Sequence, residues 1–152
     1  MKTIDEIQKT YTQLFTRNEA LYHALAKHFQ LSDCSLWILS YLLQGDPGAY
    51  TQSDLCVFLS QPRQTVNSAL KKMETEKLIE FHYQENSKKM KRIFLTEKGI
   101  LLAKKTASEI TSAEKAAFQS LSNAERNTFL EIFEKYLTQL EQEVQKIYEI
   151  DK

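Results

Sequence analysis

The sequence predicts a mainly α-helical fold with a single β-hairpin and a long helix at each end of the chain. The 152 residues include only 3 Gly and 2 Pro, too few for the many turns of a β-sandwich or barrel. Apolar residues recur every three or four positions near both ends, as on one face of a helix. One short segment after residue 78 alternates with period two, as a strand does. A chain of this length can bury a core as one domain per subunit.

The first 30 residues are expected to form one long amphipathic helix, because apolar residues recur at helical spacing from Ile4 to Phe29. Ser32 can cap a second helix, which carries the apolar cluster 36–43. The sequence Gly-Asp-Pro-Gly at 45–48 favours a turn that ends this helix.

The middle of the chain predicts two shorter helices followed by the hairpin. Thr51 and Asp54 form a variant of the capping box that opens a brief helix. Pro62 suits the first turn of the next helix, which has a buried stripe at Val66, Ala69, Leu70 and Met73. Residues 79–84 predict a strand, residues 85–91 a polar reversal, and residues 92–95 the partner strand.

The last third of the chain predicts two further helices. Thr96 can cap one helix from Glu97 to about Phe118, and the capping box 122–125 begins the final helix. Its apolar residues recur nearly to the C-terminus. Two long amphipathic helices at opposite ends are hard to bury in one subunit, so we expect them to pair across a two-fold homodimer interface. The predicted division is a dimerisation helix at 1–30, a central lobe of short helices and hairpin at 31–96, and linker and dimerisation helices at 97–152.

The formal net charge of zero hides an uneven distribution. Residues 1–60 carry a net charge of −2, residues 61–96 carry +4, and residues 97–152 carry −2. The positive excess falls on the helix after Pro62 and on the hairpin tip, where cations can meet phosphates. A short helix, a turn, a second polar helix and a basic hairpin describe a winged helix-turn-helix, whose second helix enters the major groove.

The middle of the chain resembles the MarR family of bacterial winged helix-turn-helix transcription regulators. The resemblance runs from about Leu31 to Gly99 and is carried by Thr51-Gln52-Ser53-Asp54-Leu55, Gln61-Pro62-Arg63-Gln64-Thr65-Val66-Asn67-Ser68-Ala69-Leu70, Met73-Glu74-Thr75-Glu76-Lys77-Leu78-Ile79 and Leu95-Thr96-Glu97-Lys98-Gly99. It implies a triangular homodimer with intertwined terminal helices, which binds a pseudo-palindromic operator as a repressor or, less often, as an activator. The residues predicted to contact double-stranded DNA are Thr51, Gln52, Gln61, Pro62, Arg63, Gln64, Thr65, Asn67, Ser68, Lys71, Lys72, Lys88, Lys89, Lys91 and Arg92.

The hairpin tip departs from the family pattern. Where the family's wing has Asp-x-Arg eight residues before the Leu of its Leu-Thr pair, this chain has Ser87-Lys88-Lys89. Lys lacks the planar fork of Arg, so the wing contacts are expected to be more electrostatic and less specific for shape.

An aromatic set on the first two helices has two interpretations. Core packing is the first, and a pocket for a small aromatic ligand, which the family resemblance implies, is the second. In the second interpretation, ligand binding favours a spacing of recognition helices that misfits DNA and so releases the operator. The candidate pocket residues are Tyr11, Phe15, Tyr22, Trp37 and Tyr41.

The two cysteines, Cys34 and Cys56, form no CxxC motif and suggest a reducing cytoplasm. Cys34 lies near a predicted helix start, where the helix dipole lowers thiol pKa, so a redox-sensing regulator is one alternative. Cys56 is expected to pack in the core.

Other functions have less support in the sequence. A winged-helix module that binds a protein partner is a second alternative, although the polar, basic surface favours DNA. No P-loop, GxSxG or HExxH motif indicates an enzyme, and no cofactor is expected. His23 and His28 do not share a helix face, so no metal site is predicted. No segment has the length of a signal peptide core or a membrane span.

Overall fold

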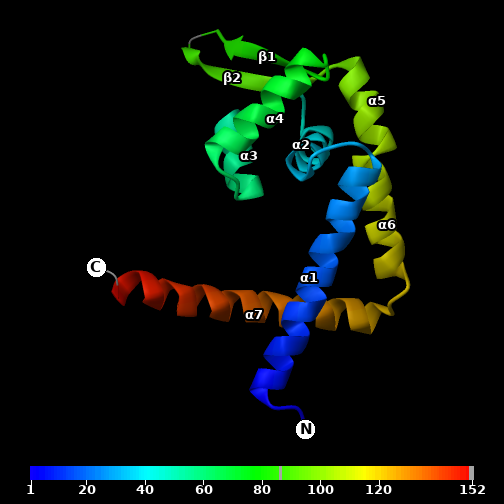
Figure 1. The fold of residues 1–152 in the computed structure, drawn as a ribbon, viewed down its shortest axis with the longest axis vertical. Helices are drawn as coiled ribbons and strands as arrows, with labels where there is room; N and C mark the ends of the chain where they lie inside the picture. The colour runs from blue at the N-terminus through cyan, green and yellow to red at the C-terminus, as the bar shows by residue number, and fades with distance from the viewer. Residues whose placement is uncertain (86, 151–152) are drawn as a thin grey trace. The chain divides into compact units, whose positions relative to one another are not determined.

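The computed structural model describes residues 1–85 and 87–150, and it confirms the predicted fold class of helices with one β-hairpin. Tertiary contacts divide the chain into two compact units, Met1–Ile110 and Thr111–Lys152. In chain order the elements are α1 (Ile4–His28), α2 (Asp33–Gln44), α3 (Gln52–Leu59), α4 (Arg63–Thr75), β1 (Ile79–Gln84), β2 (Ser87–Leu95), α5 (Glu97–Lys105), α6 (Ala107–Gln119) and α7 (Asn123–Ile150) (Figure 1).

Side-chain caps set the starts of several helices where the sequence predicts them. Each cap oxygen accepts a backbone N–H from the first turn, at 3.0–3.3 Å. The predicted caps that form are Ser32, Thr51, Thr96 and Ser122. The boxes at Thr51 and Ser122 are reciprocal, because the acidic side chains of Asp54 and Glu125 accept the N–H of the cap residues at 2.8 and 2.7 Å. An unpredicted capping box at Thr3 starts α1.

The main core of the first unit lies where α2, α3, α4, α5 and the hairpin meet. Leu39, Leu55, Leu70 and Ile93 are each at most 1% exposed, and each comes from a different one of these elements. The buried stripe of α4 is the predicted one, at Val66, Ala69, Leu70 and Met73. The helix-turn-helix and the hairpin therefore share one core, which fixes α4 relative to β1 and β2 (Figure 1).

The helix expected from Glu97 to about Phe118 is interrupted, so this part of the prediction is wrong. Thr106 separates α5 from α6 with backbone angles of φ −125° and ψ −77°. Its hydroxyl donates to the Leu102 carbonyl at 2.7 Å, and its N–H bonds to the Ala103 carbonyl at 3.3 Å. A buried β-branched residue that bonds back to the preceding turn accounts for the break.

The hairpin also differs from the prediction, because its second strand begins at Ser87 instead of Arg92. The two strands pair in antiparallel register from Ile79 with Leu95 to Tyr83 with Lys91, and the register shifts beyond Tyr83. The polar residues before Arg92 have no period-two pattern, yet they belong to the strand because their backbone pairs with β1. Hydrogen bonds between strands do not depend on side-chain polarity.

The long terminal helices expose large apolar side chains. On α1 these include Ile4, Ile7, Leu14 and Phe15, and α7 has no buried residue. The exposed large apolar residues of α7 are Phe129, Leu130, Ile132, Phe133, Tyr136, Leu137, Leu140, Ile147, Tyr148 and Ile150. Within residues 1–85 and 87–150, no helix combines the length and apolar character needed to cross a bilayer.

Candidate nucleic-acid interface

The α4 helix has one buried face and one polar, exposed face. Its buried stripe packs into the core, which holds the opposite face outward. On that face Gln61, Pro62, Arg63, Gln64, Thr65, Ser68, Lys71 and Lys72 are exposed, and Asn67 is half-buried. The structure thus brings the predicted recognition residues at the start of this helix together on one surface, and its Arg, Gln, Asn, Ser and Thr side chains carry donors and acceptors of the kind that suit base edges in the major groove.

The start of α3 lies against the start of α4. The Gln52 side-chain amide donates to the Arg63 carbonyl at 3.4 Å, linking the two helices of the helix-turn-helix. The Thr51 hydroxyl donates to Asp54 at 2.9 Å and also caps α3. Hydrogen bonds from the Thr51 backbone and side chain, with a smaller contribution from the charge of Arg92, lower the pKa of Asp54. Thr51 therefore caps α3, as the sequence predicts, and its hydroxyl is already hydrogen-bonded within the subunit.

Two of the four predicted wing cations have partners within the subunit. The Lys91 Nζ lies 5.4 Å from the ring centroid of Phe81 and 5.3 Å from that of Tyr83, which are cation–π distances. The Arg92 guanidinium donates to the Ala49 carbonyl at 2.8 Å. The other two, Lys88 and Lys89, belong to β2, but their side chains lie outside the described part of the structure.

The predicted aromatic pocket set separates into three groups. Tyr22 contacts Trp37, with ring centroids 5.0 Å apart, whereas Tyr41 stacks on Phe58 at 5.2 Å. Tyr11 and Phe15 form a pair at 6.1 Å, and both are exposed, so core packing is wrong for these two residues within the subunit. Of the five, only Tyr22 and Trp37 line a cavity described below.

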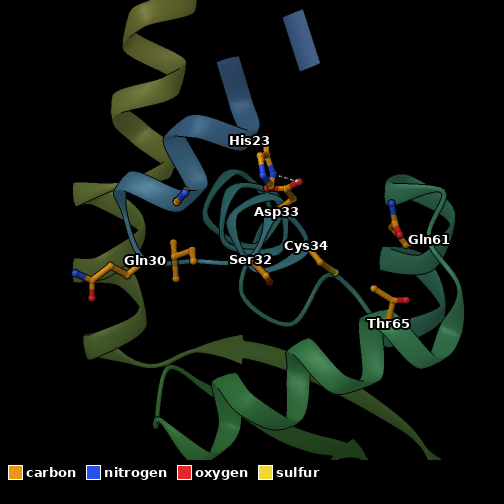
Figure 2. A pocket seen from close by; sticks show the side chains of 9 residues that line it. His23, Gln30, Ser32, Asp33, Cys34, Gln61 and Thr65 are labelled. Carbon is orange, nitrogen blue, oxygen red and sulfur yellow. Dashed lines mark hydrogen bonds and ion pairs between the residues drawn. The ribbon is translucent and has the colours of Figure 1, made fainter. Parts of the chain in front are cut away.

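That cavity, of about 350 Å³, lies within the first unit between α1, α2 and the α3–α4 turn. Its lining residues are Asn18, Glu19, Tyr22, His23, Asp33, Cys34, Trp37, Leu59 and Gln61. A neighbouring cavity of about 570 Å³ shares four of them and adds Thr65 from α4 (Figure 2). Gln61 and Thr65 are predicted DNA-contacting residues, so the cavities adjoin the recognition surface.

His23 and Asp33 are cavity residues that the sequence did not single out for this role. The His23 Nδ1 lies 2.9 Å from Asp33 Oδ2, and this pair connects α1 with the start of α2 (Figure 2). The two residues are ten positions apart and belong to different helices. Only the chain reversal between α1 and α2 brings them together, and no sequence period signals it.

Cys34 lines both cavities, but its chemistry differs from the expectation. Burial raises the pKa of the Cys34 thiol, and the nearby Cys56 raises it further. The expected lowering by the helix dipole is therefore wrong, because the half-buried thiol is poorly solvated. A raised pKa leaves less of the reactive thiolate and argues against Cys34 as a redox sensor. Cys56 packs against the core, as expected.

The helix pair α3–α4, joined by a short turn and followed by the β1–β2 hairpin, defines a winged helix-turn-helix. Residues 29–89 match the model of the MarR family. The match covers the winged helix-turn-helix segment, and the chain is similar to the MarR family over these residues.

Solved structures of regulators of this family share the fold. MepR of S. aureus in its DNA-binding conformation is 26% identical, with a TM-score of 0.72, over 86% of this chain and 98% of that chain. A MarR-family regulator from Listeria monocytogenes, solved with a 26mer DNA, is 23% identical, with a TM-score of 0.70, over 92% and 90% of the two chains. The regulator SlyA is 22% identical, with a TM-score of 0.66, over 97% and 99%. Among curated protein sequences, none matches this chain.

Proposed function

We propose that this protein is a DNA-binding transcription regulator that acts in the cytoplasm as a homodimer and not as an enzyme. The observation that carries the proposal is the exposed polar face of α4, held outward by its buried stripe and followed by a hairpin with a cationic tip. Arg63 near the start of α4 has the chemistry to pair with guanine, and Gln64 and Asn67 have the chemistry to pair with adenine. The similar structures that contain DNA support the same assignment.

The apolar faces of α1 and α7 support the homodimer. The α7 helix is 28 residues long and buries none of its side chains within one subunit. A second copy of the chain is the partner that a two-fold DNA site requires, since each copy then presents one α4 to one half-site. The two half-sites would lie about 34 Å apart, one turn of the double helix. The negative net charge outside residues 61–96 makes non-specific affinity modest, so binding depends on this pairing and on a matched site.

Substitutions of Arg63 and Lys89 test how base reading and phosphate contact are divided. We expect Arg63→Ala to weaken binding at a matched site by about 1–3 kcal/mol and to relax the sequence preference. We expect Lys89→Ala to weaken binding to all DNA sequences by the same factor and to reduce the slope of log K against log salt by about 1. Fluorescence anisotropy with matched and scrambled duplexes at several salt concentrations measures both effects.

The control for this experiment is Lys104→Ala, which removes an exposed cation from α5 outside the predicted surface. Its binding should equal that of the wild type at every salt concentration. Equal losses of specificity and of salt slope in the Arg63 and Lys89 variants would show that the two roles are assigned wrongly.

The aromatic cavity at Tyr22 and Trp37 supports regulation by a small aromatic ligand. The Tyr22 and Trp37 rings, tilted by 52° with centroids 5.0 Å apart, both line this cavity, and Gln61 of the α3–α4 turn lines it as well. A ligand that favours one placement of this turn would change the spacing of the two α4 helices and so lower operator affinity.

The intrinsic fluorescence of Trp37 can report ligand binding, because it is the only Trp in the chain. We expect a phenolic or other aromatic compound that weakens DNA binding to quench Trp37 fluorescence over the same concentration range. Tyr22→Ala should shift both titrations together, whereas Tyr41→Phe, outside the cavity lining, should leave both unchanged. A compound that releases DNA equally well from the wild type and the Tyr22 variant would place its site elsewhere.

A further inference from the structure

The loop between α2 and α3 lies along β2 over several consecutive residues. Gly48 is so close to Phe94 that an added Cβ would lie 2.2 Å from its ring. The Ala49 carbonyl accepts a hydrogen bond from Arg92, and the Tyr50 carbonyl accepts the Ile93 N–H at 3.0 Å.

The same contact continues into the start of α3. An isolated antiparallel bridge pairs Thr51 with Arg92, and Thr51 is the residue that caps α3. The loop therefore joins the wing to the helix-turn-helix through one isolated bridge and one further backbone hydrogen bond.

Arg92 makes the side-chain link in this contact. It is half-buried, and its Nη1 reaches the backbone of a residue 43 positions earlier, at 2.8 Å. Its neighbour Lys91 points to the opposite face of the hairpin, over Phe81 and Tyr83, as alternation along a strand requires. The two adjacent cations thus differ in position and in partner, although the sequence alone groups them with the wing.

We propose that Arg92 is a positioning residue that holds the wing at a fixed angle to the helix-turn-helix, and not a phosphate contact. Its guanidinium spans the gap between β2 and the Ala49 carbonyl, where a planar group with several fixed N–H donors is better organised than a flexible ammonium. Loss of this link removes the side-chain hydrogen bond between β2 and the α2–α3 loop, leaving the backbone bonds and the packing of the core, and widens the range of wing angles. The cationic tip then meets the DNA backbone less often. This inference rests on the proposed DNA-binding function.

A double-mutant cycle tests the proposal, with Arg92→Ala made both in the wild type and in a chain carrying Lys88→Ala and Lys89→Ala. In the wild-type background Arg92→Ala should weaken binding to a matched duplex by about tenfold. In the background without the tip cations the same substitution should change affinity by less than about twofold, because a displaced wing without Lys88 and Lys89 has no tip contact with DNA to weaken. Multiplicative effects in the two backgrounds would overturn the proposal and make Arg92 an independent contact with DNA.

Hydrogen exchange of the free protein gives a readout that needs no DNA. The Ile93 amide, bonded to Tyr50, should exchange at least tenfold faster in Arg92→Ala, while core amides in α2 keep their rates. An unchanged Ile93 rate would overturn the proposal, and unfolding in urea establishes that the variant is folded. If the wild type binds no duplex, the regulator assignment fails, but the exchange experiment still decides whether Arg92 anchors the wing.

Discussion

Phe133→Asp in α7 is expected to convert the proposed homodimer into monomers and to abolish tight binding to a two-half-site operator. Phe133 is 41% exposed within one subunit and stacks on Phe129 with ring centroids 5.9 Å apart. It belongs to an apolar stripe that no part of the subunit buries. In a two-fold interface each substitution occurs twice, so two buried rings are lost and two carboxylates lose their hydration.

The size of this effect follows from the burial of each ring. Fully burying a Phe side chain contributes about 1.5–3 kcal/mol, and 41% of each ring is left to bury, so the dimer loses about 1.2–2.5 kcal/mol from the two rings. Each interface carboxylate costs at least about 1 kcal/mol more in lost hydration, so the dimer dissociation constant should rise by about 100-fold, since 1.4 kcal/mol corresponds to a factor of ten. Sedimentation equilibrium measures the dissociation constant, and gel shift with one-half-site and two-half-site duplexes measures its consequence for DNA binding.

Lys135→Asp is the matched control, because it introduces the same side chain two positions along the helix, about 200° around its axis. This variant should remain a dimer with operator affinity close to that of the wild type. A dimeric Phe133→Asp variant with normal affinity would show that the α7 stripe is not the interface.

Gly99→Ala is expected to destabilise the fold by about 3 kcal/mol, which is the upper end of the usual cost of overpacking. A Cβ at this position would lie 2.0 Å from the Leu78 carbonyl oxygen and 3.1 Å from Leu95 Cδ2. The Leu78 carbonyl cannot move away easily, because it accepts the Thr96 N–H at 3.0 Å just before α5. At an exposed helix position the same substitution would raise the free energy of unfolding by about 1 kcal/mol. A decrease in the Gly99→Ala variant would therefore show that α5 closely approaches the start of β1.

Gly45→Ala provides the comparison for this prediction. Its added Cβ would also meet a neighbour, at 2.4 Å, but that neighbour is the outer edge of the Tyr50 ring. A side chain can rotate where a backbone carbonyl cannot, so the loss of stability should be clearly smaller than for Gly99→Ala. Urea unfolding gives both values, and equal values for the two variants would contradict this account of Gly99.

The sequence predicted the helix starts well, because capping depends on residues within one turn. Ser32, Thr51, Thr96 and Ser122 each satisfy N–H groups that a helix start leaves unpaired, and this need does not depend on tertiary structure. The break at Thr106 was not predicted, because β-branched residues are common within helices and only its buried position makes the back-bonded hydroxyl decisive.

The candidate DNA surface was predictable where it lies on a single helix. The polar face of α4 follows from its 3.6-residue period and its buried stripe. The roles of Lys91 and Arg92 were not predictable in this way, since their partners belong to the opposite strand and to a loop about 40 residues away. The same reason separates Tyr22 and Trp37 from the other aromatic residues, because helix packing, and not spacing along the chain, decides which rings meet.

The central claim is that two copies of α4 read two half-sites of one operator. Footprinting of the purified protein on genomic fragments, including the DNA upstream of its own gene, tests it most directly. The account predicts protection of a pseudo-palindrome with half-site centres about 10 base pairs apart, occupied by two chains, at concentrations at least 1,000-fold below those that coat unrelated DNA. Protection of no sequence over unrelated DNA at any salt concentration would contradict it.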